Sequence, residues 1–115
     1  MVREIIAYKG YYQDFMEKLS DKEQMKIRRA LLLFSDTEKI PSHFIKYLED
    51  DIYEFRVNYG SNEFRILFIY DGEKLVILFN AFRKKTQKTP RSEINKAKRL
   101  KKEYYEYKNA NIQCE

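Results

Sequence analysis

Several residue types are scarce in this sequence, whose 115 residues include one cysteine, one histidine, two prolines and three glycines. Because Cys114 is alone, an intramolecular disulfide and a paired-cysteine metal site are excluded, which fits a reducing compartment. We find no repeat, no low-complexity linker, no nucleotide-binding glycine loop and no apolar run long enough to span a bilayer. The length and these absences predict a single cytoplasmic domain, residues 1–115, with no metal and no cofactor.

Positive charge, in contrast, is abundant and unevenly placed. The formal net charge is +5, but residues 83–102 alone contain ten cations and one anion, a net of +9, so the other 95 residues sum to −4. This basic segment follows an apolar run that ends at Phe82, and it begins "RKKTQKTPR". Such a patch favours a polyanionic partner, nucleic acid above all.

Hydrophobic periodicity and turn residues predict the order β-α-α-β-β-β-α, an α+β domain with its helices on one face of an antiparallel meander. The capping box of Ser20 and Glu23 separates two helices within residues 11–34, and Pro41 opens a short helical turn around residues 44–48. The other predicted elements are strands at 3–8, 52–59, 64–70 and 74–82, and a basic C-terminal helix capped by Thr89 that reaches Tyr104.

Turn chemistry predicts the register of the meander. Two-residue turns at Gly60–Ser61 and Asp71–Gly72 place Arg56 opposite Arg65, and Arg65 opposite Leu78. One face of the sheet is then an apolar and aromatic wall: Tyr53, Phe55, Val57, Tyr59, Phe64, Ile66, Phe68, Tyr70, Leu75, Ile77 and Phe79.

The opposite face carries the two arginines next to each other, an arrangement that is unfavourable unless an anion accompanies them. Glu54 or a helix carboxylate could neutralise them, or they could form a site in which phosphate oxygens accept both guanidinium groups. Lys84 would join this face, but it lies six residues beyond Leu78, roughly 20 Å along a straight strand. Either the sheet curls, the basic loop folds back, or the bound anion is a nucleic-acid backbone.

The stretch "IYEFRV…FRILFIYDGEKLVILFNAFRKKTQKTPRSEINKAKR" resembles the phage-derived HigB-like branch of the RelE/ParE toxin superfamily. The similarity rests on the "YEFR" strand, the "FRI" strand, an apolar strand and "KKTQKTP" leading into a basic helix, over about residues 50–100. It implies a RelE-like fold and the toxin of a type II toxin–antitoxin system. The implied activity is ribosome-dependent, metal-independent mRNA cleavage, in which the 2′-hydroxyl of the RNA attacks the adjacent phosphate.

Placed on this sequence, the basic positions of the family fall on Arg56, Arg65, Lys84 and Lys85. We expect Arg56, Arg65 and Lys85 to stabilise the pentavalent phosphate, and Lys84 or Lys85, ahead of Glu54, to transfer protons. The sequence departs from relatives in three places. Glu54 stands where RelE has a lysine. The region of Arg91 stands where RelE has a tyrosine. The single histidine lies before the meander, whereas a histidine of HigB proteins lies near the C-terminus.

That histidine, His43, is predicted to be a surface residue rather than a catalyst. RNA contacts are expected from further cations of the basic segment: Arg83, Lys88, Arg91, Lys98, Arg99 and Lys102.

The resemblance also implies partners: mRNA in the A site of the 70S ribosome, and a cognate antitoxin that is a helix-turn-helix protein. It further implies that the toxin–antitoxin complex binds its operator DNA, and that no membrane is involved. Two other functions stay open at this stage. One is a ParE-like inhibitor of DNA gyrase without nuclease chemistry, and the other is a non-catalytic RNA-binding module.

Overall fold

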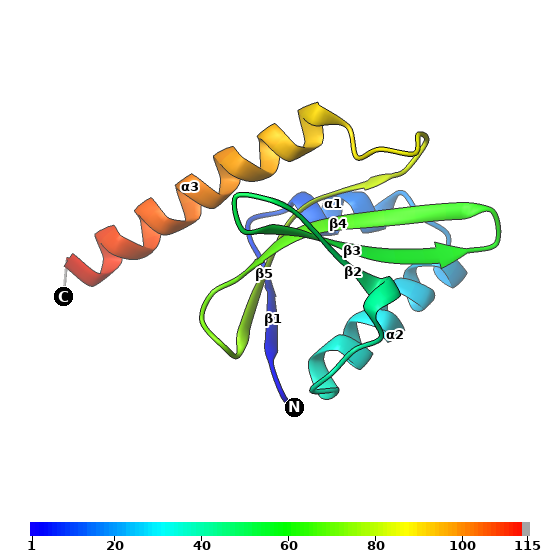
Figure 1. Ribbon diagram of the computed structural model, residues 1–115, viewed down its shortest axis with the longest axis horizontal. Coiled ribbons are helices and arrows are strands. Elements are labelled where there is room, and N and C mark those ends of the chain that lie inside the picture. The colour runs from blue at the N-terminus through cyan, green and yellow to red at the C-terminus, as the bar shows by residue number, and fades with distance from the viewer. Residues whose placement is uncertain (114–115) are drawn as a thin grey trace.

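A computed structural model describes residues 1–113, so Cys114 lies outside the described residues. Within that range a five-stranded mixed sheet is flanked by helices on both sides (Figure 1). The elements in chain order are β1 (Glu4–Ala7), α1 (Tyr11–Glu17), α2 (Asp21–Asp36), a 3-10 turn (Ser42–Phe44), β2 (Ile45–Glu49), β3 (Ile52–Tyr59), β4 (Asn62–Tyr70), β5 (Leu75–Arg83) and α3 (Arg91–Gln113). The α+β class is confirmed, and so are the N-terminal strand, the helical pair and the C-terminal helix.

The order of the sheet is β1-β5-β4-β3-β2, with β1 parallel to β5 and every other pair antiparallel. The predicted three-stranded meander is therefore wrong, because β2 adds a fourth strand at the edge, with Ile45 opposite Phe55. The predicted helical turn around residues 44–48 is wrong, because the 3-10 turn spans Ser42–Phe44 and the strand β2 begins at Ile45. The chain becomes extended at Ile45 because β3 offers it a free edge with which to pair.

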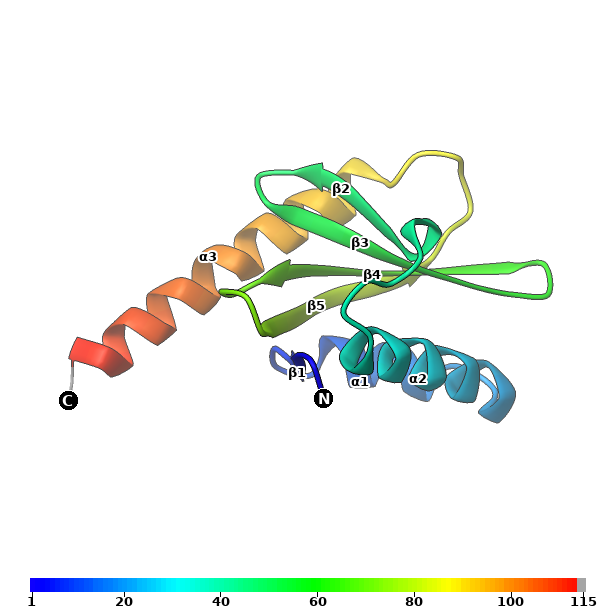
Figure 2. The same cartoon turned by 60° about the horizontal axis from the view of Figure 1, so that its bottom comes forward.

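Two apolar cores lie on opposite faces of the sheet. Met16 of α1 and Ile27, Ala30 and Phe34 of α2 pack on one face. On the other face Ala97 and Leu100 of α3 pack against the sheet. Figure 2 shows α1 and α2 on one side and α3 on the other, so the expectation that all helices share one face is wrong. A sheet covered on both faces explains why residues 66–70 of β4 and 75–79 of β5 are apolar without alternation.

The predicted Gly60–Ser61 turn is confirmed, since Gly60 has a φ of 60° and Tyr59 pairs with Asn62. A glycine tolerates this left-handed conformation without strain. The turn places Arg56 opposite Arg65, as predicted.

The predicted Asp71–Gly72 turn is wrong. Four residues separate β4 from β5, and a register shift between Ile66 and Phe68 changes the pairing again. Val76 and Leu78 consequently face α1 and α2, whereas Ile77 and Phe79 face α3, the reverse of the predicted faces.

The longer loop and the register shift together bring the basic segment to the arginines. Arg65 lies opposite Phe82 rather than Leu78, and the backbone N–H of Lys84 donates to the carbonyl of Glu63 at 2.8 Å. The expected 20 Å gap between Arg65 and Lys84 therefore does not exist.

None of the helices within residues 1–113 is both long enough and apolar enough to cross a bilayer.

Candidate functional site

Arg65 lies on the same face of the sheet as α3, at the centre of a polar part of that face that α3 does not cover. Its side chain is only 2% exposed, although a guanidinium group is rarely buried without partners. One terminal nitrogen donates to the carbonyl of Phe64 at 2.9 Å and to Oδ1 of Asn58 at 3.5 Å, and the other donates to Oε1 of Glu63 at 2.9 Å. These contacts hold the guanidinium group in a single orientation.

Glu54 supplies the countercharge for the facing arginines. It is 1% exposed, and its Oε1 lies 3.5 Å from Nε of Arg56 and 3.5 Å from Nε of Arg65. Its other oxygen accepts a hydrogen bond from the hydroxyl of Thr89, which fastens the end of the basic loop to β3. The predicted cap at Thr89 is wrong, because α3 begins at Arg91 directly after Pro90, and the Thr89 hydroxyl donates to Glu54 instead.

Two buried polar atoms at the centre of this arrangement have no hydrogen-bond partner among residues 1–113: Oε1 of Glu54 and Nε of Arg65. Their 3.5 Å separation gives them electrostatic attraction without hydrogen-bond geometry. Buried polar atoms are satisfied in most proteins, and exceptions are frequent where a ligand or a reaction uses them. Arg56 is more accessible, with 32% of its side chain exposed.

Lys84 completes the group that we call the arginine cluster: Glu54, Arg56, Arg65 and Lys84. Burial lowers the pKa of Lys84, and the positive charges of Arg65 and Arg56 lower it further, whereas Glu54 and Glu63 oppose the shift. The two arginines and the two glutamates therefore all act electrostatically on the ammonium group of Lys84. A lysine with a depressed pKa releases and accepts protons more readily near neutral pH.

A cavity of about 350 Å³ opens beside the two arginines. Its lining includes Lys26 of α2, His43 of the 3-10 turn, and Arg56, Asn58, Glu63 and Arg65 of the β3–β4 hairpin. His43 is exposed, as predicted, yet it lines the same cavity as both arginines. Sequence reasoning missed this proximity because the histidine precedes β2 and only tertiary structure brings it beside β3.

The remaining predicted RNA-binding residues fall into two sets. Arg83 lies on the α1–α2 face, 3.4 Å from Oε2 of Glu23, with its guanidinium group over the ring of Phe64. On α3, Arg91 and Lys98 both pair with Glu49 of β2. Hydrogen bonds from Arg91 and then Lys98 lower the pKa of Glu49 to about 2.

Four of the predicted RNA-binding or catalytic cations are exposed and unpaired within the described residues. Within residues 1–113, Lys85, Lys88, Arg99 and Lys102 are exposed and take part in no ion pair. Of the predicted cations outside the arginine cluster, these four are the ones available to an external anion.

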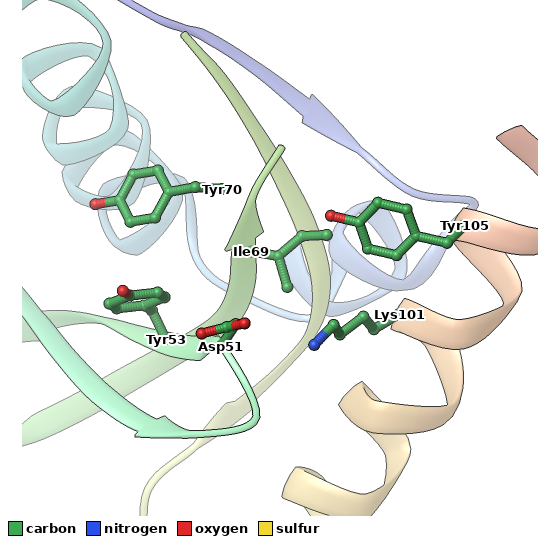
Figure 3. Close-up of a pocket in the computed structure, with 6 residues that line it drawn as sticks. All are labelled: Asp51, Tyr53, Ile69, Tyr70, Lys101 and Tyr105. Atoms are coloured by element: carbon green, nitrogen blue, oxygen red, sulfur yellow. The ribbon is translucent and has the colours of Figure 1, made fainter. Parts of the chain in front are cut away.

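A second cavity, of about 200 Å³, lies between α3 and the other end of the β3–β4 hairpin (Figure 3). Lys101 and Tyr105 extend into it from α3, opposite Asp51, Tyr53, Ile69 and Tyr70. The ammonium group of Lys101 already donates to the carbonyl of Asp50 at 2.5 Å. This cavity has no arginine and no polar atom left unpaired in the described chain, so the arginine cluster is the stronger candidate.

The arrangement can do two things chemically. Two forked cations and a lysine can bind and neutralise a phosphate, and groups at its rim can exchange protons with it. Within residues 1–113 no cluster of three or more His, Cys, Asp or Glu side chains is placed to bind a metal ion.

Comparison with known proteins agrees with this fold. The family described as "Phage derived protein Gp49-like (DUF891)" matches residues 14–102, which include the whole arginine cluster. No curated protein matches the chain. The fold is similar to that in the crystal structure of the archaeal RelE–RelB complex from Pyrococcus horikoshii OT3, with a TM-score of 0.50 and 10% identity, over 70% of this chain and 93% of that one. These similarities confirm the resemblance to phage-derived, RelE-like proteins.

Proposed function

The chain belongs to the phage-derived Gp49-like family and has a RelE-like fold, and from this premise we propose that it is the toxin of a type II toxin–antitoxin system. Its proposed activity is metal-independent cleavage of mRNA in the ribosomal A site. The observation that carries the proposal is the arginine cluster. In it the buried Arg65 of β4 lies directly opposite Arg56 of the neighbouring strand β3, beside an open cavity.

In the proposed reaction the 2′-oxygen of a nucleotide bonds to the adjacent phosphorus while the bond from phosphorus to the 5′-oxygen breaks. A base takes the proton of the 2′-hydroxyl, and an acid protonates the departing 5′-oxygen. Negative charge develops on the phosphate oxygens, where fixed cations stabilise the transition state more than the ground state. Arg65 is held in one orientation and Arg56 is accessible, so the pair suits this role.

Lys84 is the proposed acid, because it lies beside Arg65 and its ammonium group has a lowered pKa. We assign Glu54 to positioning rather than to proton transfer. One of its oxygens accepts a hydrogen bond from Thr89 and the other lies between two guanidinium groups, so a substrate hydroxyl would have to displace an arginine to reach it.

Partners follow from the same proposal. The exposed cations Lys85, Lys88, Arg99 and Lys102 supply contacts to ribosomal RNA or mRNA phosphates. The archaeal relative is a RelE in complex with RelB, which supports a cognate antitoxin as the regulatory partner here. We propose a helix-turn-helix antitoxin whose complex with this chain binds the operator DNA.

The test is primer extension on an mRNA translated in a reconstituted system, with the wild-type protein, Arg65→Ala and Arg83→Ala. Arg83 is the matched control, because it is an arginine of the neighbouring strand that lies on the opposite face. We expect ribosome-dependent cuts within codons for the wild type and Arg83→Ala, and none for Arg65→Ala. Undisturbed translation without cuts would reject the proposal, and a gyrase supercoiling assay would then test the ParE-like alternative.

A further inference from the structure

We propose that His43 is the general base of this reaction, the group that takes the proton of the 2′-hydroxyl. The inference rests on the proposed function and adds a residue that the sequence predicted to be exposed and not catalytic. It is carried by the 3-10 turn, Ser42–Phe44, whose His43 lines the cavity beside Arg56 and Arg65.

The position of His43 follows from where β2 begins. The pairing between β2 and β3 starts at Ile45 and Phe55, so Arg56 and the rest of β3 beyond it lie at an open edge. The 3-10 turn fills the space beside that edge, and His43 and Arg56 line the same cavity. A substrate in this cavity would therefore meet the imidazole on the α2 side of the β3 edge and the two arginines on the α3 side.

Aromatic packing holds the imidazole in place. Its ring lies 4.3 Å from the ring of Phe44, centroid to centroid, with an interplanar angle of 33°. Phe44 stacks on the buried Phe55 at 5.8 Å and 16°, and Phe55 stacks on Phe34 of α2. An exposed histidine is thus connected by stacked rings to the centre of the core, which limits the orientations open to its ring.

The other ionisable groups around this cavity are poorly suited to accept a proton. Lys26 of α2, Arg56 of β3 and Arg65 of β4 are cations, and cations offer no lone pair. Oε1 of Glu63 of β4 already accepts a hydrogen bond from Arg65 at 2.9 Å, so that oxygen is engaged. An imidazole is the side chain that exchanges a proton near neutral pH, and it accepts one in its neutral form.

His43 and Lys84 lie on opposite sides of the arginine pair. His43 borders β3 at the edge, whereas Lys84 follows β5, two strands away and so roughly 10 Å across the sheet. Displacement at phosphorus places the attacking and leaving oxygens nearly in line on opposite sides of the phosphate. A neutral imidazole on one side and an ammonium group on the other match these two requirements.

The protons balance in this scheme. His43 gains the proton of the 2′-hydroxyl as the new bond between the 2′-oxygen and phosphorus forms. Lys84 gives a proton to the 5′-oxygen as its bond to phosphorus breaks. The products are a 2′,3′-cyclic phosphate and a 5′-hydroxyl, and later proton exchange with water restores both side chains.

The experiment is single-turnover cleavage of an mRNA in the A site of programmed 70S ribosomes, with either oxygen or sulfur as the 5′-bridging atom. A sulfur leaving group departs without protonation, so it compensates for a missing acid but not for a missing base. On the oxygen substrate we expect His43→Gln and Lys84→Gln to cleave about 100-fold more slowly than wild type. On the sulfur substrate Lys84→Gln should recover, and His43→Gln should stay slow.

Lys22→Gln is the matched control, because Lys22 is an exposed lysine one turn earlier on α2 that does not line the cavity. It should cleave both substrates within about threefold of wild type, well below the effect of losing an acid or base. A pH profile gives a second readout, because general-base catalysis makes the rate rise with pH, and His43→Gln should lose that rise. A change in packing alone would not remove that rise.

Wild-type rates for His43→Gln on the oxygen substrate would overturn this inference and leave the proposed function intact. Recovery of His43→Gln on the sulfur substrate would also overturn it, because the histidine would then be the acid. A wild-type protein that cleaves neither substrate would reject the proposed function and the inference together.

Discussion

The molecule has two cationic regions that differ in how their charge is balanced. In the arginine cluster, the guanidinium group of Arg65 is 2% exposed and shares one buried carboxylate, Glu54, with Arg56. On the flank of α3, Arg91 and Lys98 are accessible and pair with Glu49 at the surface. Burying charge is expensive, whereas surface pairs form and break at little free-energy change. Positive charge that persists in the interior of a small domain therefore indicates a function better than the much larger number of cations along α3.

The largest difference between the two regions should appear when the same arginine substitution is made in each. Arg56→Gln removes a cation that faces the proposed phosphate, and we expect cleavage to fall by about 10²- to 10³-fold. Arg91→Gln removes a cation that already pairs with Glu49, and cleavage should stay near the wild-type rate. Single-turnover cleavage on programmed ribosomes measures both. An equal loss in the two variants would show that position in the buried cluster has no special role.

A carboxylate exchange compares the two regions through stability. Glu54→Gln keeps the shape of the side chain but removes the charge between Arg56 and Arg65, and the free energy of unfolding should fall by about 3 kcal/mol. Glu49→Gln removes an exposed partner of α3 and should change that free energy little. Urea denaturation at neutral pH followed by circular dichroism provides the values. A Glu54→Gln protein as stable as wild type would mean that Glu63 alone balances Arg65.

The facing arginines could be predicted from sequence because their register depends on a single local feature. Gly60 supplies the positive φ of a two-residue turn, and the pairing of Arg56 with Arg65 follows by counting along two strands. The buried countercharge could be predicted in the same way, because Glu54 and Arg56 are two residues apart on one strand and therefore share a face. Local turn chemistry and strand alternation thus define the centre of the site.

The parts that could not be predicted depend on tertiary structure. The loop after Tyr70 contains an Asp-Gly pair that suits a tight turn, but it is four residues long, and the shift near Phe68 changes the register again. Because β5 is apolar on both faces, hydrophobicity could not detect either change. β2 is a short edge strand that forms only where β3 offers a partner, and the placement of His43 depends on it.

Substituting the exposed cations of α3 should have a smaller effect, on ribosome affinity, because contacts between exposed cations and phosphates are screened by solvent. The double variant Arg99→Gln/Lys102→Gln should bind ribosomes several-fold more weakly at low salt. Its slope of log affinity against log salt should decrease in magnitude by about 1 to 2, since two phosphate contacts are lost. The cleavage rate of bound complexes should be unchanged. Arg91→Gln/Lys98→Gln serves as the control, and an equal change in its slope would place the RNA along the whole helix.

The smallest effect concerns the pairing of α3 with Glu49. Hydrogen bonds from Arg91 and Lys98 lower the pKa of Glu49 from 4.5 to about 2 in the folded protein. The stabilisation from this lowered pKa is therefore complete above the unfolded value and is lost as pH falls from about 4.5 toward 2. Thermal unfolding over that range should show a slightly steeper loss of stability for wild type than for Glu49→Gln, and added salt should reduce the difference. Identical pH dependences would mean that Glu49 does not hold Arg91 and Lys98 in solution. Both residues would then be free to contact RNA, and the contrast between a balanced helix flank and a functional buried cluster would be lost.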